Sequence, residues 1–363
     1  MPEPAFTLMI EPMKGCNLTC RYCYSDNRGK DVLELKTLHA VFEKISAYLE
    51  QEDCREIHIL WHGGEPLLAG LDFFKKGLGM AAAFFSRIHC RHFIQTNGLL
   101  INDEFSHLFR DKGVEVGISL DGPRKIHDRM RRFKDGSGSW ERVMEKMDLM
   151  EKCDLSFGIC MTQTVLCRRE EERIFRFFNS LGHPLRVNPV IPSPYAGNAN
   201  RFLLDKGEYG SLLCRFFDEW ISTPEHRISI SPIDNYLGAL IGEGITECRH
   251  QPSCIGRHLG IKPDGRAVLC SPFEDMTLGS LLDSTVQDLF DAAVCRQIKG
   301  RAEALMECRS CINRSICHGG CPFLAHAAGY TTGETDPLCV DYKRIFTHMR
   351  RALTTPGIQG MAS

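Results

Sequence analysis

The chain has 363 residues, and its 44 lysines and arginines nearly balance its 46 aspartates and glutamates, giving a net charge of -2. Because neither sign dominates, the composition argues against a nucleic-acid or anionic-membrane partner and favours a peptide or a small molecule. The 18 cysteines would be hazardous in an oxidising compartment, so they predict a cytoplasmic location in which thiolates can hold metal. No apolar run is long enough to span a bilayer, and the N-terminal residues lack the pattern of an export signal.

Short β-rich runs alternate with helical patterns through the first half of the chain. We expect strands at 6–12, 56–62, 92–96, 114–119, 155–162 and 185–190, and helices at 35–52, 72–86, 102–112, 139–152 and 168–181. Asn102 is expected to cap its helix. Such alternation predicts a parallel sheet, and six units are enough to close most of a barrel, so the expected class is α/β with a partial (β/α)6 barrel. In that architecture the loops after the strands carry the chemistry.

The second half of the chain changes character. Residues 189–199 are rich in proline and small polar residues and read as a linker or an irregular wall, and helices are expected at 206–222 and 233–242. Beyond Cys248 cysteines concentrate, and the segment from Ile261 to Cys270 predicts a hairpin that turns at Asp264–Gly265. We therefore expect a barrel core at 1–200, a helical bridge at 201–247, a cysteine-rich domain at 248–345, and a helix end with a frayed tail at 346–363.

Three cysteines in a CxxxCxxC array, Cys16, Cys20 and Cys23, follow the first expected strand. Three thiolates ligate three irons of a four-iron cluster and leave the fourth iron open to a small molecule, for which the aromatic Tyr24 suits a pocket. A zinc site is the competing interpretation of such a spacing.

Polar loops follow the next three strands, and together with the cysteine array they resemble the radical SAM superfamily. The array matches that family, and Gly63-Gly64-Glu65-Pro66 resembles the turn that holds the methionyl amine of S-adenosylmethionine, although such a turn is also ordinary after a strand. The resemblance implies reductive cleavage of S-adenosylmethionine to a 5'-deoxyadenosyl radical, which abstracts hydrogen from a substrate. It also implies further contacts to this cofactor from Gln95, Asn97, Ser119 and Asp121.

A basic stretch follows the loop after the fourth expected strand. By the same resemblance Arg131 binds the methionyl carboxylate, which suits a planar guanidinium. The alternative is that Arg129, Arg131 and Arg132 form a solvated basic face. His127 fits a surface position as well as an active-site one.

The eight cysteines of the tail are enough for two complete four-iron clusters. Zinc sites compete with this interpretation, although only Cys308 and Cys311 form a zinc-type knuckle, and disulfides do not suit a reducing compartment. Order and spacing resemble the SPASM domain of peptide-modifying radical SAM enzymes. The resemblance assigns Cys248, Cys254, Cys270 and Cys321 to a nearer auxiliary cluster, and Cys308, Cys311, Cys317 and Cys339 to a farther one. The seven other cysteines are expected to pack as small apolar residues: Cys54, Cys90, Cys153, Cys160, Cys167, Cys214 and Cys295.

The whole pattern resembles the anaerobic sulfatase-maturating enzymes and related enzymes that modify ribosomally made peptides. In the sulfatase maturases an aspartate that acts as a base follows the third SPASM cysteine, whereas here Ser271 follows Cys270. A serine hydroxyl is a poor base, so the role would pass to Glu274 or Asp275. We therefore expect a cross-linking enzyme, with a sulfatase maturase and a non-catalytic iron–sulfur scaffold as the alternatives.

The resemblance also implies the cofactors and partners. These are three four-iron clusters, S-adenosylmethionine, a peptide or protein substrate, and a low-potential electron donor such as flavodoxin or ferredoxin. No separate leader-peptide domain is expected.

Overall fold

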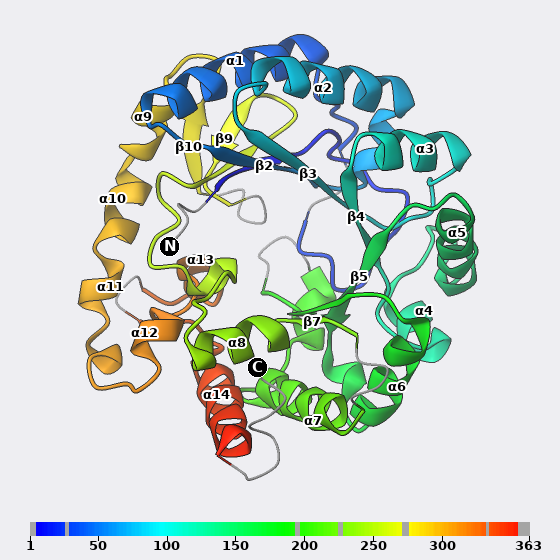
Figure 1. The fold of residues 1–363 in the computed structure, drawn as a ribbon, viewed down its shortest axis with the longest axis vertical. Coiled ribbons are helices and arrows are strands. Elements are labelled where there is room, and N and C mark those ends of the chain that lie inside the picture. The colour runs from blue at the N-terminus through cyan, green and yellow to red at the C-terminus, as the bar shows by residue number, and fades with distance from the viewer. Residues whose placement is uncertain are drawn as a thin grey trace. The chain divides into compact units, whose positions relative to one another are not determined.

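The computed structural model describes residues 5–25, 29–192, 197–223, 228–270, 276–331 and 334–354. These residues form two compact units, each assembled from segments that are distant in the sequence. The first unit comprises Met1–Leu120, Asp128–Gly158 and Ser253–Lys299, and the second comprises Asp121–His127, Ile159–Pro252 and Gly300–Ser363. Figure 1 labels their elements.

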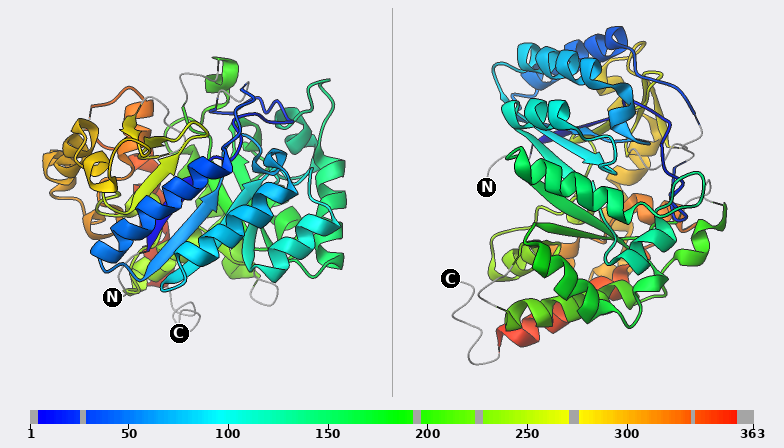
Figure 2. Two further views of the ribbon diagram at one scale, coloured as in Figure 1. Left: turned by 90° about the horizontal axis from the view of Figure 1, so that it is seen from above. Right: turned by 90° about the vertical axis from the view of Figure 1, so that its right-hand side faces the viewer.

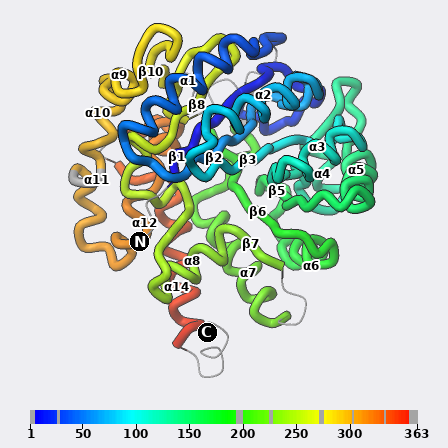
Figure 3. Tube along the Cα trace, turned by 45° about the horizontal axis from the view of Figure 1, so that its top comes forward, coloured from blue at the N-terminus to red at the C-terminus, as the bar shows by residue number. Residues whose placement is uncertain are grey.

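The sheet of the first unit has the strand order β10-β9-β8-β1-β2-β3-β4. Its strands are β1 (Phe6–Ile10), β2 (Glu56–Trp61), β3 (His89–Thr96), β4 (Val114–Ser119), β8 (His258–Ile261), β9 (Arg266–Val268) and β10 (Thr277–Ser280). The strands from β8 to β4 run parallel, whereas β9 and β10 are antiparallel additions beside β8. Figure 3 shows β8 alongside β1, although the two strands are far apart in the sequence.

Helices cover this sheet. They are α1 (Leu35–Gln51), α2 (Leu71–Phe84), α3 (Asp103–Asp111), α5 (Trp140–Lys152), α9 (Val286–Phe290) and α10 (Ala293–Lys299), with a 3-10 turn η1 (Pro66–Ala69). Figure 2 shows α1 and α2 side by side over the strands. Trp61 of β2 is fully buried, and its ring centroid lies 6.1 Å and 5.6 Å from those of Phe73 and Phe74 of α2. Alternate residues of a strand face opposite sides of the sheet. In β1 and β2 the buried residues alternate with half-buried ones, so the face opposite the buried residues is available to a site.

The second unit contains the parallel strands β5 (Phe157–Gln163), β6 (Leu185–Pro189) and β7 (Ile230–Ser231). Its longer helices are α6 (Glu171–Leu181), α7 (Glu208–Ser222), α8 (Ile233–Ile241) and α14 (Cys339–Leu353). Short helices complete it: η2 (Val165–Cys167), η3 (Gly197–Phe202), η5 (Cys248–His250), α11 (Arg301–Ala304), η6 (Met306–Cys308), α12 (Arg314–Cys317) and α13 (Pro322–Ala327). The chain passes between the units several times, once within α4 (Arg124–Met130) and once within β5.

Helices α7 and α14 pack closely against each other, and Figure 1 shows both at the base of the view. The carboxylate of Asp341 accepts hydrogen bonds from the backbone of Gly207 (3.2 Å) and Gly210 (2.8 Å) at the start of α7. A β-carbon on Gly210 would lie 2.6 Å from the carbonyl oxygen of Asp341, so only glycine allows this approach.

The predicted alternation of strands and helices is confirmed, including Asn102 as the N-cap of α3, whose side chain accepts from Phe105 N at 2.9 Å. The hairpin is confirmed as well, because β8 and β9 are antiparallel and Gly265 has a φ of +83°. The parallel pairing of β8 with β1 was not predicted, because register between distant segments leaves no local pattern. No described helix has the length and apolarity needed to cross a membrane.

Candidate active site

The loop that carries Cys16, Cys20 and Cys23 leaves β1 and is held by a later segment of the same unit. Thr19 N donates to the carbonyl of Arg132 at 2.8 Å, and Arg21 N donates to that of Met130 at 2.9 Å. Leu18, which is buried, forms an isolated bridge with Phe133. The three thiols are therefore presented by a loop whose backbone is fixed on one side, as pre-organised metal ligands require.

The thiols of this loop lie in a partly dry environment. Burial raises the pKa of Cys16 to about 12, and burial likewise raises the pKa of Cys23. Repulsion from Cys20 adds a smaller amount to the rise in the pKa of Cys16, and repulsion from Cys16 adds to that of Cys23. Thiolates in such a place require a metal that displaces the protons, and a cluster held by three cysteines fits this donor set.

The glycine turn after β2 docks directly on the approach to the cysteine loop. Gly64 N donates to Met13 O at 3.1 Å, and Glu65 N donates to Gly15 O at 2.8 Å. A β-carbon on Gly64 would collide with the carbonyl oxygens of Lys14 and Gly15, which are backbone atoms. Only glycine therefore lets the turn reach the cysteine loop.

Replacing Gly64 with alanine is expected to displace the cysteine loop and to lower both iron content and S-adenosylmethionine cleavage severalfold or more. Gly79→Ala is the matched control, because Gly79 is exposed on α2 and a β-carbon there meets nothing within 4 Å. Helix propensity favours that change by about 1 kcal/mol. Iron per protein and released 5'-deoxyadenosine measure the difference, and equal values for both variants would contradict the close-approach argument.

Glu65 links the glycine turn to the end of β3. Its Oε1 accepts hydrogen bonds from Thr96 Oγ1 (2.6 Å) and Leu67 N (3.1 Å), and its Oε2 accepts from Asn97 N (2.8 Å). The side chain is buried, and burial raises the pKa of Glu65 to about 7. The carboxylate thus organises two of the predicted cofactor loops, and Oε2 keeps a lone pair for a further donor.

Asn97 reaches the cysteine loop from the end of β3. Its Nδ2 lies 2.7 Å from Asn17 Oδ1 and 3.7 Å from Cys16 Sγ, while its Oδ1 accepts from Leu99 N at 3.1 Å. Two residues before Asn97, Gln95 donates through Nε2 to Ser119 Oγ at 3.0 Å. Three of the predicted cofactor residues thus lie at neighbouring strand ends of the first unit, where a parallel sheet places its site.

Arg131 is buried and faces the cysteine loop. Its guanidinium carbon lies 5.3 Å from the ring centroid of Tyr22. Burial raises the pKa of both Cys23 and Glu65, and the charge of Arg131 offsets a small part of each rise. Since only 8% of Arg131 is exposed, the solvated-face interpretation is wrong for this residue. Arg129 is exposed, as that interpretation expected, whereas Arg132 is half-buried.

Two buried residues follow β4, namely Asp121 in the loop and His127 in α4. Asp121 Oδ1 accepts from Thr162 N of β5 at 3.1 Å, and Asp121 N donates to His127 Nδ1 at 3.3 Å. His127 is fully buried, so the surface interpretation of this histidine is wrong. Tyr24 and Pro66, the other predicted cofactor residues, are half-buried and buried, respectively.

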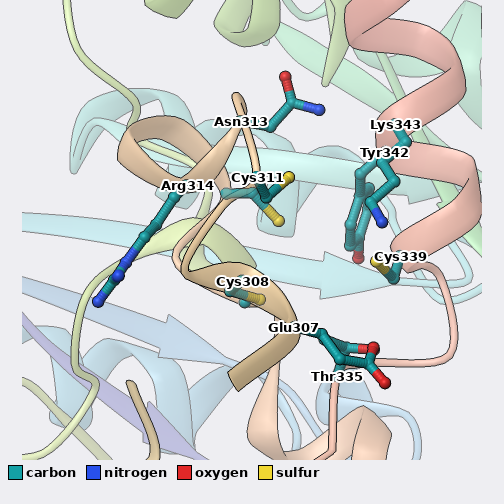
Figure 4. A pocket seen from close by; sticks show the side chains of 11 residues that line it. Glu307, Cys308, Cys311, Asn313, Arg314, Thr335, Cys339, Tyr342 and Lys343 are labelled. Atoms are coloured by element: carbon teal, nitrogen blue, oxygen red, sulfur yellow. The ribbon is translucent and has the colours of Figure 1, made fainter. Parts of the chain in front are cut away.

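Four cysteines of the tail line one cavity in the second unit. Cys308, Cys311, Cys317 and Cys339 share its wall with Tyr342 and Lys343. In Figure 4 the sulfurs of Cys308 and Cys339 face each other across the cavity from separate chain segments. Among the described residues, no three histidine, cysteine or acidic side chains converge as ligands of a single metal ion do. Four thiols around a space suit a cluster better than one zinc ion.

Cys321 lies outside this wall, and its thiol interacts electrostatically with Cys248 in the same unit. Burial raises the pKa of Cys321 to about 12. Cys254 and Cys270, which complete the predicted ligand set, belong to the first unit and are half-buried. The predicted base residues Glu274 and Asp275, and Ser271 beside them, lie outside the described residues.

Two buried charged side chains hold the turn between Cys317 and Cys321, and sequence reasoning missed both. Arg301 donates to the carbonyls of Gly319 (3.0 Å) and Gly320 (3.2 Å). Asp336 accepts from Cys321 N (2.8 Å) and from Tyr342 Oη (3.1 Å). No motif marks either residue, and the only sequence signal was that Asp336 stands three residues before Cys339.

A buried histidine completes this support. Burial lowers the pKa of His250 to about 3, so its ring is neutral. Nδ1 lies 3.3 Å from the carbonyl oxygen of Cys317 and therefore carries the proton, while Nε2, 3.0 Å from Tyr236 Oη, accepts from that hydroxyl. Such outer hydrogen bonds orient metal ligands.

Asp336→Asn is expected to lower the iron content of the tail. The amide group must turn one N–H toward a donor that the carboxylate accepted, which leaves a buried donor without an acceptor at a cost of about 1–3 kcal/mol. Glu307→Gln is the control, because Glu307 lines the same cavity but is exposed. Iron per protein and the thermal midpoint measure both, and a loss confined to Glu307→Gln would contradict the argument.

Of the remaining cysteines, Cys153, Cys167 and Cys295 are buried, as expected for packing residues. Cys54, Cys90, Cys160 and Cys214 are half-buried. Cys160 Sγ accepts a hydrogen bond from Asn188 Nδ2 at 3.2 Å.

Comparisons with known proteins agree with this arrangement. Residues 10–178 match the radical SAM superfamily, and residues 248–312 match the SPASM iron–sulfur cluster-binding domain. The chain belongs to the radical SAM superfamily and carries a SPASM domain, so it is an enzyme with iron–sulfur clusters and S-adenosylmethionine as cofactors and with the partial-barrel fold. The prediction of fold class is thereby confirmed, and the scaffold alternative is wrong.

Among its relatives are the anaerobic sulfatase-maturating enzymes. The chain is 29% identical to the serine-type enzyme of Klebsiella aerogenes, with 95% of this chain and 85% of the relative covered. It is 25% identical to the cysteine-type enzyme of Clostridium perfringens, over 95% and 96% of the two chains. The structure matches that of anSMEcpe with bound AdoMet and Cp18Cys peptide at a TM-score of 0.85 and 23% identity, with 99% of each chain covered.

Proposed function

We propose that the enzyme uses the 5'-deoxyadenosyl radical to cross-link side chains of a ribosomally made peptide. That a peptide or protein is the substrate is supported by the sulfatase-maturating relatives and by the similar structure that carries a peptide. The single observation that carries the finer proposal is Ser271 directly after Cys270, where the maturases have a basic aspartate. Cross-linking enzymes do not share one fixed base at that place.

The chain's own residues divide into two sets. The first set, Cys16, Cys20 and Cys23, would hold the cluster that binds S-adenosylmethionine. When both are bound, the cluster and S-adenosylmethionine would supply the 5'-deoxyadenosyl radical. Gly63 and Gly64 bring the turn's backbone to the methionyl amine, and Glu65, Asn97 and the Gln95–Ser119 pair fix the loops around it. Arg131, buried and cationic, binds the methionyl carboxylate.

The tail holds two auxiliary clusters. Cys308, Cys311, Cys317 and Cys339 hold the farther one, which their shared cavity supports. Cys248, Cys254, Cys270 and Cys321 hold the nearer one, with Glu274 or Asp275 as the nearby base. A low-potential flavodoxin or ferredoxin in the cytoplasm supplies the electrons.

Formylglycine formation in a sulfatase is the second candidate, since the maturase relatives are covered almost from end to end. A mass change alone separates the two only in part. Oxidation of cysteine to formylglycine loses sulfur, whereas oxidation of serine and cross-linking each remove two hydrogens.

The test offers the anaerobically reconstituted enzyme three peptides: the product of a small reading frame beside its gene, and sulfatase-derived peptides with cysteine or serine at the target position. We expect the first to lose two hydrogens, to give no fragment ions between the linked residues, and to remain unreactive toward a hydrazide. A hydrazide-reactive aldehyde in either sulfatase peptide, with the first peptide unmodified, would establish the maturase instead.

A further inference from the structure

Several residues that stand next in the chain to the lining of the tail cavity carry large, exposed apolar side chains. The three most exposed large apolar side chains among the described residues are Ile312 (77%), Met306 (62%) and Val340 (45%). Each is the immediate chain neighbour of a residue that lines the cavity of Cys308, Cys311, Cys317 and Cys339. Exposed apolar groups that gather around one feature mark an interaction surface.

The charges around the same cavity are mostly positive. Arg314 and Lys343 line it with Glu307 as the single carboxylate among its lining residues, and Arg309 follows Cys308 in the chain. All three cations are exposed, and none forms an ion pair within the described part of the chain. Figure 4 shows Lys343 on the same helix as Cys339, and Val340 is one turn away from Lys343 on that helix.

We propose that Met306, Ile312 and Val340, with Arg309, Arg314 and Lys343, form a docking surface for an acidic one-electron carrier protein of the flavodoxin type. The inference rests on the proposed assignment of the four cysteines to a metal cluster. A partner bound over this cavity would lie next to the proposed metal cluster. A protein that exchanges electrons with the cluster therefore suits this surface better than a peptide substrate does. The cations attract an acidic partner and speed its approach.

A second copy of the chain suits this surface less well. A two-fold dimer would bring the same patch of each subunit together, so the three cations of one subunit would lie opposite the same three cations of the other. Like charges across an interface oppose association.

The test measures the affinity of purified, acidic flavodoxin for the reconstituted holoenzyme. Met306→Ser combined with Ile312→Ser is expected to weaken binding about tenfold, because buried apolar anchors carry most of the energy of an interface. Lys343→Glu is expected to weaken binding at low salt and to have less effect at high salt. Ile241→Ser is the control, since Ile241 is 40% exposed at the end of α8.

Iron content and peptide modification driven by a chemical reductant are measured alongside, because these two readouts do not need the carrier. Failure of modification with intact docking would contradict the proposed function alone. Absence of binding by the wild type, equal affinity of all variants, or a changed oligomeric state in place of a changed affinity would each overturn the docking proposal.

Discussion

Replacing Cys20 with alanine is expected to abolish release of 5'-deoxyadenosine, with a drop of about a hundredfold or more. Two thiolates cannot ligate three irons of the cluster, and Cys20 is the second cysteine of the CxxxCxxC array. Replacing Cys311, which lines the tail cavity, is expected to spare part of the abortive cleavage while the modified peptide is lost. Anaerobic assays that quantify both products measure the split.

Cys54→Ala is the control for these two variants, because Cys54 is half-buried and lies outside the predicted ligand sets, and its thiol donates to the Glu56 carbonyl at 3.3 Å. It is expected to retain both activities. Equal loss in Cys20→Ala and Cys311→Ala, together with a lowered thermal midpoint in the latter, would mean that the tail cysteines are needed for folding alone, since metal binding and folding are coupled.

Replacing Glu65 with alanine is expected to lower the free energy of unfolding by about 3–5 kcal/mol, because three buried donors lose their acceptor. These donors are Leu67 N, Thr96 Oγ1 and Asn97 N. Glu43→Ala, at an exposed position of α1, is expected to change stability little. Denaturant unfolding of the anaerobic holoprotein measures both, and similar values for the two variants would contradict the role given to Glu65.

Glu65 also predicts a pH dependence. Burial raises the pKa of this carboxyl from 4.5 to about 7 in the folded protein. The folded state therefore binds the proton more tightly than the unfolded state does, and the resulting stability, present below pH 4.5, is lost as the pH rises through about 7. Relative to Glu65→Gln, the unfolding free energy of the wild type should fall over this interval, and parallel curves for the two proteins would refute the shift.

The sequence was sufficient to predict features that depend on short stretches of the chain. Strand and helix periodicity predicted β1 to β6 and the longer helices α1, α2, α3, α5 and α6, although the short helix α4 was missed. The resemblance to the SPASM domain grouped the four thiols that line one cavity. The paired glycines predicted a close approach of the backbone to a ligand, whereas the close approach that the structure shows is that of Gly64 to the backbone at Lys14 and Gly15.

Features that depend on long-range contacts could not be predicted. Arg131 and His127 stand in a strongly charged stretch, and only the folded chain shows that both are buried. Arg301 and Asp336 hydrogen-bond to the turn between Cys317 and Cys321, which is many residues away from Arg301 in the chain. Neither residue belongs to a recognisable motif. The pairing of β8 with β1 depends on the same kind of distant contact.

That pairing bears on how the chain folds during synthesis. Thr7 of β1 leaves the ribosome early, yet its partner His258 emerges only after most of the chain has been made. Until then one edge of β1 offers unpaired backbone groups to any other strand. Expression of the first 200 residues alone should consequently give aggregates, and the nascent protein should depend on chaperones until the segment that forms β8 has emerged.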